Sequence, residues 1–208
     1  MKVKTLMKIL LYGQMIFIRT FATNTIRCTN LMRSIIIFDN KMPSLYLEKN
    51  IIVDDNLKHK LYSIEHIFPR SHMLNTHAND MHNLIKTTNN LNVNRSNYQY
   101  TDVMDNDRNW IKLDHDNFVN HKKRLFIPNK SSRGFISRAI LYMTREYDYN
   151  FVKVIKKDVL QNWFYEYPPT KSEIYHNDII KKLQHTNNMF ISNYNKKKSL
   201  VTKYISEL

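Results

Sequence analysis

Glycine is nearly absent from this chain. Only two of its 208 residues are glycine, Gly13 and Gly134. Phosphate-binding loops and dinucleotide-binding turns need clustered glycines, because only a residue without a side chain lets the backbone approach a phosphate closely. The sequence therefore excludes P-loop nucleotide hydrolases and dinucleotide-binding oxidoreductases.

Cysteine is scarcer still. The single cysteine, Cys28, excludes an internal disulfide and every multi-cysteine metal site. The chain has 42% hydrophobic residues, which is enough for one domain with an uncrosslinked core. No apolar run reaches the ~18–20 residues of a membrane helix, so we expect no integral membrane span. The missing disulfide framework favours an intracellular protein.

The charge is strongly positive. Lysine and arginine number 32 against 18 acidic residues, a net charge of +14. Nucleic acid is the commonest partner that matches such an excess, because each neutralised phosphate releases counterions. The alternative is a codon bias toward lysine, asparagine, isoleucine and tyrosine that carries no functional demand.

The N-terminal segment 1–38 contains no acidic residue. Its basic start and apolar stretch are compatible with a secretory signal, with an organelle transit peptide, or with a basic leader that serves neither purpose. The predicted organisation is a basic leader over residues 1–38, one folded domain over 39–194 and a basic tail over 195–208. We expect a monomer.

Strands are predicted in the first half of the chain from short apolar or alternating runs. They cover Ser34–Phe38, Lys60–Ile67 and Met81–Ile85. Thr87 or Thr88 then caps a helix that runs to about Asn97. Residues 106–120 are polar and predicted to be rich in loops.

Helices are predicted in the last third. Ser131 or Ser132 caps the first, whose apolar positions repeat every 3.6 residues: Ile136, Ala139, Ile140 and Met143. The second runs from Phe151 to Tyr165. Thr170 and Glu173 form a capping-box pattern that begins the third, which reaches about Gln184.

The chemically informative window is residues 62–98. Phosphodiester hydrolysis needs a base near neutral pH, for which histidine is suited, and a divalent cation to stabilise the phosphate. Magnesium accepts one or two protein oxygens and keeps several waters. Glu65 and His66 are adjacent at a strand end, so they converge only if the strand is distorted there. Asn92 and Arg95 lie three residues apart and share one helix face.

Three sequence blocks in this window resemble the endonuclease I family of the ββα-metal (His-metal finger) superfamily. The family pattern is Glu-His-aliphatic-x-Pro, then Asp-(Leu/Met)-His-Asn-Leu, then Val-Asn-x-x-Arg-(Ser/Gly)-Asn-aromatic. The matching residues are Glu65, His66, Ile67 and Pro69, then Asp80, Met81, His82, Asn83 and Leu84, then Asn92, Arg95, Ser96, Asn97 and Tyr98, with Leu91 in place of Val.

The resemblance continues downstream, so that it covers about residues 60–192. The matching positions are Arg133, Gly134, Arg138, Ala139, Tyr142, Met143, Trp163, Pro168, Glu173, Asn177, Ile180, Gln184, Asn187, Asn188, Phe190 and Ile191. The final motif departs from the family pattern at His185, Met189 and Ser192. The short loop between His66 and Asp80 lacks the long insertion from which some relatives contribute an arginine.

The resemblance implies an α+β fold with a ββα-metal finger in a mainly helical body. It implies a sequence-nonspecific endonuclease that cleaves DNA to 5′-phosphate ends, and it leaves open whether RNA is a second substrate. The cofactor would be Mg²⁺ or another divalent cation such as Mn²⁺, held by Glu65 and Asn92, with His66 as general base.

Four arginines are candidates for contacts to the nucleic acid. Arg70 and Arg95 are the candidates beside the reacting phosphate, and Arg95 has a structural ion pair with Asp80 as its alternative role. Arg133 and Arg138 are candidates for backbone phosphates. His82 and Asn83 are predicted to hold the finger together by hydrogen bonds. The alternative function is a catalytically inactive nucleic-acid-binding module of the same fold.

Overall fold

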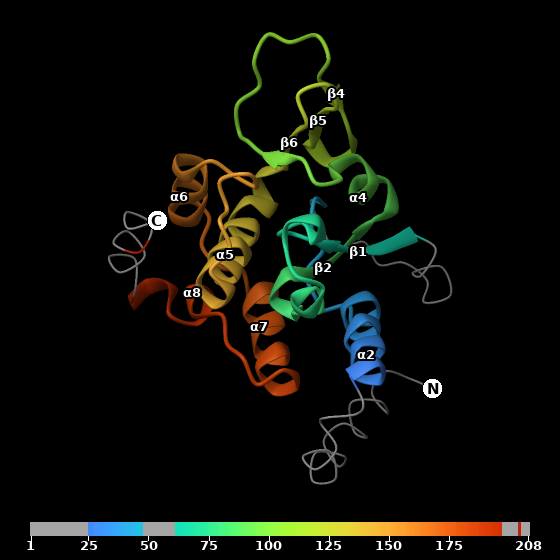
Figure 1. The fold of residues 1–208 in the computed structure, drawn as a ribbon, viewed down its shortest axis with the longest axis vertical. Helices are drawn as coiled ribbons and strands as arrows, with labels where there is room; N and C mark the ends of the chain where they lie inside the picture. The colour runs from blue at the N-terminus through green and yellow to red at the C-terminus, as the bar shows by residue number, and fades with distance from the viewer. Residues whose placement is uncertain (1–24, 48–60, 197–203, 205–208) are drawn as a thin grey trace.

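The computed structural model of the chain describes residues 25–47, 61–196 and 204. The predicted α+β class is confirmed, with helices forming the body and two small sheets beside it (Figure 1). The helices are α2 (Thr25–Phe38), α4 (Asn89–Arg95), α5 (Lys130–Tyr147), α6 (Lys157–Glu166), α7 (Lys171–Leu183) and α8 (Met189–Ser192). The strands are β1 (Tyr62–His66), β2 (Leu84–Thr88), β3 (Gln99–Tyr100), β4 (Ile111–Lys112), β5 (Phe118–Asn120) and β6 (Leu125–Ile127).

The first sheet is an antiparallel pair followed directly by a helix. β1 pairs with β2 from Tyr62↔Thr88 to His66↔Leu84. The side chain of Thr88 accepts from the Leu91 amide at 3.3 Å and caps α4, which confirms one of the two predicted caps. The predicted strand Met81–Ile85 begins three residues too early. Asp80 accepts from the His82 amide at 2.9 Å and winds Met81–Asn83 into a 3₁₀ turn, η3.

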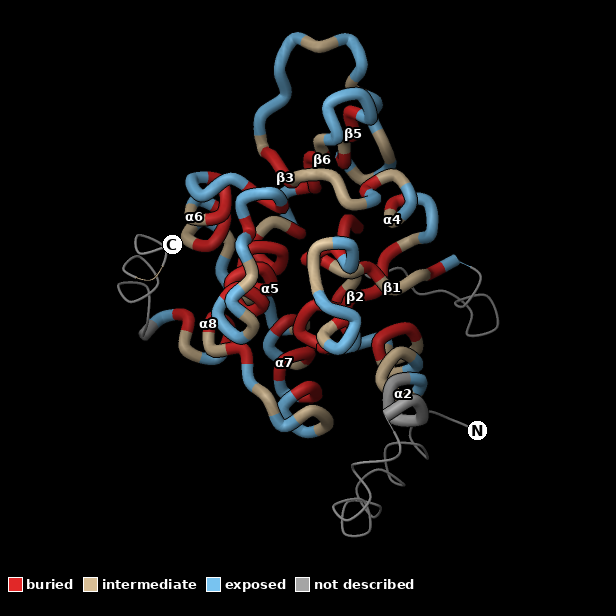
Figure 2. Tube along the Cα trace, viewed as in Figure 1, coloured by how far each residue is buried: buried red, intermediate tan, exposed pale blue. Residues whose placement is uncertain are grey.

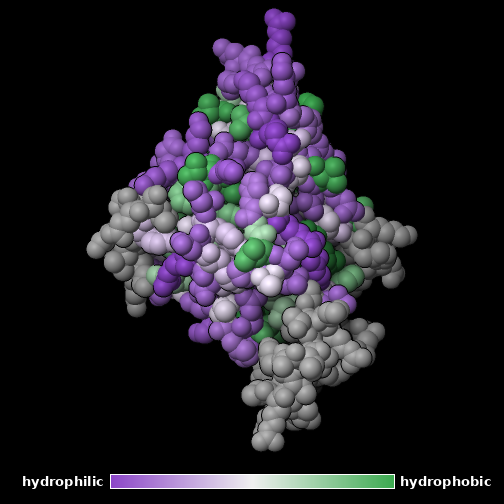
Figure 3. All heavy atoms as spheres, in the orientation of Figure 1, coloured by the Kyte–Doolittle hydropathy of each residue, from purple (hydrophilic) through white to green (hydrophobic). Residues whose placement is uncertain are grey.

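The second sheet has the strand order β3-β6-β5-β4. β4 and β5 lie within residues 106–120, where the sequence predicted loops. Strands of two or three residues are too short to show an alternating pattern. Hydrophilic side chains cover the end of the molecule that carries β4 and β5 (Figures 1 and 3).

The predicted strand Ser34–Phe38 is wrong, because this segment belongs to α2. Ile36 is buried against Met81, Leu84 and Ile180. A run of isoleucines suits a strand or a buried helix equally, and only the packing decides between them. Because α2 packs on the β1–β2 pair, residues 30–38 contribute to the domain. The predicted leader and tail otherwise lie mainly outside the described residues, and the domain boundaries stay predictions.

Two of the three helices predicted in the last third, α5 and α7, follow the sequence pattern closely. The apolar positions Ile136, Ala139, Ile140 and Met143 of α5 are all buried (Figure 2). Asn129 caps α5 instead of Ser131 or Ser132 by accepting from the Ser132 amide at 3.2 Å. Thr170 caps α7 as predicted.

α6 begins at Lys157, six residues later than the predicted Phe151. The preceding residues form a turn instead, in which the Val154 and Ile155 amides donate to the Phe151 carbonyl at 2.7 and 2.9 Å. The Tyr100 amide donates to the Val154 carbonyl at 2.8 Å and holds this turn against β3. In the described part of the chain, no helix is both long and apolar enough to cross a membrane.

Two buried histidines couple the stability of this core to pH. His176 is 2% exposed and stacks on Phe135, and His82 is 3% exposed and packs on Tyr142. Burial lowers the pKa of His176 from 6.5 to about 3 and that of His82 to about 4. Below pH 6.5 the unfolded chain therefore binds protons that the folded chain excludes.

We expect the free energy of unfolding to lose ~1.4 kcal/mol per pH unit for each of these histidines as the pH falls from about 6.5 to 5. Urea denaturation at several pH values measures this loss. Replacement of His176 by glutamine removes one of the two histidines, so the slope of the unfolding free energy against pH should fall by ~1.4 kcal/mol per pH unit. The comparison variant is His121→Gln, at an exposed site. Equal pH dependence in the His176→Gln and unmodified chains would contradict the expectation.

Candidate active site

The site begins at the free edge of β1. In the described part of the chain, β1 pairs with β2 alone, so alternate carbonyls on its other edge need donors. α4 supplies them. The Asn92 amide nitrogen donates to the Ile64 carbonyl at 3.3 Å, and Arg95 Nη1 donates to the His66 carbonyl at 3.3 Å. The predicted shared face of Asn92 and Arg95 is thus confirmed.

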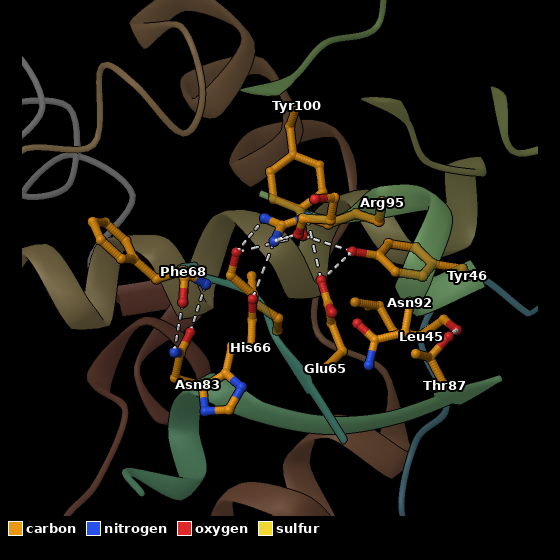
Figure 4. A network of polar contacts seen from close by, with 12 residues as sticks. Leu45, Tyr46, Glu65, His66, Phe68, Asn83, Thr87, Asn92, Arg95 and Tyr100 are labelled. Carbon is orange, nitrogen blue, oxygen red and sulfur yellow. Dashed lines mark hydrogen bonds and ion pairs between the residues drawn. The ribbon is translucent and has the colours of Figure 1, made fainter. Parts of the chain in front are cut away.

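Arg95 lies at the centre of this contact and is 1% exposed. Its Nη2 donates to the Ile67 carbonyl at 2.6 Å, and its Nη1 also donates to the Ser96 carbonyl at 2.9 Å. The guanidinium carbon lies 4.4 Å from the centre of the Tyr100 ring. Its Nε lies 3.2 Å from Oε1 of Glu65, an ion pair without hydrogen-bond alignment. The guanidinium therefore joins β1, α4 and β3 into one unit (Figure 4).

Glu65 is 2% exposed and meets Arg95 on one side and Tyr46 on the other. The Tyr46 hydroxyl donates to Oε1 of Glu65 at 3.0 Å and lies 2.6 Å from the Tyr100 hydroxyl. A phenol has one proton, so Tyr100 donates to Tyr46. Both contacts of Glu65 use Oε1, and Oε2 takes part in neither.

Tyr46 is held in a costly backbone conformation. Its φ is 65°, a left-handed value that is an outlier for a bulky residue. The Ser132 hydroxyl accepts from its amide at 2.7 Å, and the Asn117 amide donates to its carbonyl at 2.8 Å. These bonds fix the phenol against Glu65, although nothing in the sequence marks Tyr46.

The electrostatics of Glu65 favour a cation. Burial raises the pKa of Glu65 to about 7, and the Arg95 charge and the Tyr46 hydrogen bond offset only part of that effect. One guanidinium therefore leaves the buried carboxylate short of positive charge. A divalent cation near this carboxylate would stabilise its ionised form.

The side-chain amide of Asn92 offers a second oxygen, beside the Glu65 carboxylate, that could bind a divalent cation. Its nitrogen donates to the Ser63 hydroxyl at 2.8 Å and to the Ile64 carbonyl. A backbone carbonyl only accepts, so this contact fixes the amide orientation and frees Oδ1. In Figure 4 the amide oxygen of Asn92 faces Glu65. Two hard oxygens match what Mg²⁺ requires from a protein. The described residues contain no group of three histidine, cysteine or acidic side chains able to bind a metal.

His66 is arranged to accept a proton. Its Nε2 lies 2.9 Å from the Ala78 carbonyl, and because a carbonyl only accepts, Nε2 carries the hydrogen. The basic lone pair is therefore on Nδ1. Burial lowers the pKa of His66, and the positive charges of Arg33, Arg70 and Arg95 lower it further. A neutral imidazole at neutral pH follows.

β1 is regular at Glu65 and His66, so the condition under which the two side chains would converge is not met. Both residues pair in register with β2, Glu65 with Ile85 and His66 with Leu84. Their side chains point to opposite sides of the strand in Figure 4. The carboxylate joins the buried cluster around Arg95, and the imidazole turns toward the Ala78 loop.

Hydrogen bonds hold the loop that carries Ala78 in place, and the Asn83 side chain makes two of them, as predicted. The Asn83 side chain accepts from the Phe68 amide at 2.7 Å and donates to the Phe68 carbonyl at 3.0 Å. Asp80 accepts from the Tyr142 hydroxyl at 3.1 Å and from Gln184 Nε2 at 2.9 Å. The alternative ion pair between Arg95 and Asp80 is therefore wrong.

The four candidate arginines divide into exposed and buried ones. Arg70 is exposed and follows His66 closely in the 3₁₀ turn η1 (Arg70–His72). Arg95 and Arg138 are each 1% exposed, so in this conformation their guanidinium groups are occupied by protein contacts, and contacts from them to phosphate stay a prediction.

Arg138 contacts both carboxylate oxygens of Glu173 at 2.6 Å. Arg133 is half-buried, donates to the Pro128 carbonyl at 3.3 Å, and lies 5.4 Å from the Trp163 ring. Both belong to the α5–α6–α7 packing, and none of their contacts involves β1 or α4. Of the predicted site residues, the structure gathers Glu65, Asn92 and Arg95 in one buried cluster. His66 lies at the same strand end on the other side of β1, and Arg70 lies in the turn that follows.

The chain is similar to known nucleases. The Endonuclease I family model matches residues 12–195. An extracellular deoxyribonuclease of Aeromonas hydrophila is 34% identical over 118 residues, which are 54% of this chain and 48% of the relative. A periplasmic deoxyribonuclease of the same organism is 32% identical over 123 residues, 59% of this chain and 51% of that relative. The chain thus spans about half the length of the curated relatives it matches.

Replacement of Arg95 by methionine should destabilise the fold strongly. The change leaves Glu65 buried without its cation and removes the donors of three carbonyls, so we expect a loss of ~3–5 kcal/mol in the free energy of unfolding. Chemical denaturation measures it. Arg70→Met, at an exposed site, should stay within about 0.5 kcal/mol of the unmodified chain. Equal stability of the Arg95→Met and unmodified chains would show that the guanidinium is not structural.

Proposed function

The chain belongs to the endonuclease I family, and from this premise we propose that it hydrolyses phosphodiester bonds in DNA. The observation that carries the proposal is the arrangement at β1 and α4. A neutral His66 with its lone pair on Nδ1 shares one strand end with the oxygens of Glu65 and Asn92. The names of the Aeromonas hydrophila deoxyribonucleases support DNA as the substrate.

His66 acts as the general base in this proposal. Its Nδ1 accepts a proton from water, the water oxygen bonds to phosphorus, and the bond from phosphorus to the 3′-oxygen breaks. The released 3′-oxygen takes a proton from solvent water, and His66 later returns its proton to solvent. The products carry 5′-phosphate and 3′-hydroxyl ends. The Ala78 carbonyl holds Nε2–H, which orients the imidazole and stabilises its protonated form.

Glu65 and Asn92 would hold Mg²⁺ or a similar divalent cation, which supplies positive charge to the phosphate and to the leaving oxygen. Attacking and leaving oxygens lie on opposite sides of the phosphorus in an in-line displacement. A base and an oxygen pair on opposite sides of β1 are compatible with that geometry. Arg95 positions Glu65 and does not contact substrate in this scheme.

His66→Ala should lower the rate of DNA cleavage by ~10²–10⁴, because it removes the base and leaves the buried Glu65–Arg95 pair in place. The assay is nicking of supercoiled plasmid with Mg²⁺, and with EDTA as the blank. Binding of DNA should persist. A rate within threefold of the unmodified chain would remove His66 from the mechanism. Binding without any cleavage by the unmodified chain would favour the inactive module. RNA tested in parallel defines the substrate range.

Asn92→Ala should raise the Mg²⁺ concentration needed for half-maximal cleavage and lower the maximal rate, since it removes one oxygen of the proposed pair. The matched control is Asn94→Ala, because the Asn94 amide donates within α4, to Asn90, at 2.9 Å. Asn92→Asp restores an oxygen and should recover part of the rate. If Asn94→Ala shifts the Mg²⁺ dependence and Asn92→Ala does not, Asn92 is not the ligand.

A further inference from the structure

The turn between β5 and β6 carries four basic side chains in succession, His121-Lys122-Lys123-Arg124. All four are exposed. The turn lies near the end of the molecule where β4, β5 and β6 are labelled in Figure 1, and Figure 3 shows that this end is hydrophilic. None of its residues belongs to the family motifs. Its charges differ in how they are compensated, and this difference points to a function.

Lys123 is compensated by acidic residues. Its ammonium contacts Asp105 and lies 3.1 Å from Asp107. These contacts tie the turn to the loop that precedes β4. Lys123 is therefore a structural cation with its charge already matched.

Arg124 has neutral partners instead. Its Nη2 donates to the Asn97 side chain, and its guanidinium lies 5.0 Å from the centre of the Tyr98 ring. Within the described ranges no carboxylate pairs with Arg124 or with the exposed Lys153. The aromatic face and the amide orient the guanidinium and leave its charge unmatched.

The backbone of Arg124 is also strained, as it is at six other non-glycine residues in the described part of the chain. Its φ is 56°, in the left-handed region where glycine or asparagine is the favoured last residue of such a turn. An arginine there costs stability, and strained positions of this kind are concentrated at binding sites. The strain has a rationale if the side chain itself is needed.

Three sequence segments bring positive charge to one rim beside His66. The Asn97 side chain donates to the Ser71 hydroxyl at 3.1 Å, which joins the Arg124 contact to η1. The Gln99 amide donates to the Arg124 carbonyl at 3.0 Å, and its side chain donates to the Val152 carbonyl at 2.7 Å. Lys153, the next residue, is exposed and lies close enough to η1 for its charge to act on His72. We call Arg70, Arg124 and Lys153 the basic rim.

Two charges of this rim, those of Arg124 and Lys153, are close enough to act on one group. Burial lowers the pKa of His72 in η1, and the charges of Lys153, Arg95 and Arg124 lower it further. The rim is thus a concentration of positive charge without a matching carboxylate among the described residues. A polyanion laid along it would supply the missing negative charge.

We propose that Arg124 and Lys153 bind backbone phosphates of the DNA strand that flank the phosphate presented to His66. The proposal rests on the proposed function and extends its site to the β5–β6 turn and to the segment that precedes α6. These contacts go to phosphates, so they hold DNA of any sequence in register with the base. The proposed contacts to the DNA backbone do not involve Arg133 or Arg138.

The test is binding of a labelled duplex by the full chain in EDTA, followed by fluorescence anisotropy from about 50 to 200 mM salt. Arg124→Gln keeps a hydrogen-bond donor for Asn97 and removes the charge. It should weaken binding of every DNA sequence and reduce the slope of log K against log salt by about 1. The double variant Arg124→Gln, Lys153→Gln should reduce that slope by about 2. The control Lys182→Gln removes one exposed charge from α7 at the opposite end and should leave the slope unchanged.

Arg124→Gly separates binding from folding. Glycine suits a φ of 56°, so the Tm should not fall, while binding should weaken as in Arg124→Gln. Unchanged salt slopes in Arg124→Gln and in the double variant would overturn the proposed phosphate contacts. The proposed function would still stand in that case if the unmodified chain cleaves plasmid and His66→Ala does not. Absence of any DNA binding by the unmodified chain would overturn both this proposal and the proposed function.

Discussion

The rest of the site depends on the buried guanidinium of Arg95. It closes the open edge of β1 through the carbonyls of His66 and Ile67, and it faces the carboxylate of Glu65. Removing a charged group from water is costly, and here carbonyls, one carboxylate and the Tyr100 ring offset that cost. The strand end that carries the proposed base and the carboxylate is thereby fixed before any substrate arrives. Preorganisation of this kind lets a few side chains act on a bound phosphate without rearrangement.

Family-motif positions far from the reacting groups act through this framework. Gln184 accepts from the Met81 amide and donates to Asp80, so the end of α7 holds the loop whose Ala78 carbonyl orients His66. Arg138 and Glu173 join α5 to α7 in a buried pair. A Cβ at Gly134 would lie 2.4 Å from the Tyr167 carbonyl oxygen, which accounts for glycine at that position. These residues match the family pattern because they pack the helices together. An arginine that belongs to a nuclease motif therefore need not contact DNA.

Several of the cations that contribute to the net charge of +14 have structural roles. Arg95 and Arg138 are buried in ion pairs, Lys123 is matched by Asp105 and Asp107, and Lys112 by Asp116. Only charges without such partners are available to a polyanion. A total taken from composition therefore overstates the binding surface, and the position of each cation decides its role.

Local sequence determined much of this protein. The Thr88 and Thr170 caps, the apolar spacing in α5 and the β1–β2–α4 order were readable because each depends on neighbours within a few residues. The Glu-His and Asn-x-x-Arg blocks likewise marked the site through the family they resemble. Tertiary structure alone decided that Ser34–Phe38 is helical, that Tyr46 donates to Glu65, and that Arg95 and Arg138 are buried. Those outcomes depend on contacts between residues far apart in the chain, such as Tyr46 with Tyr100 and Arg138 with Glu173, which no local pattern encodes.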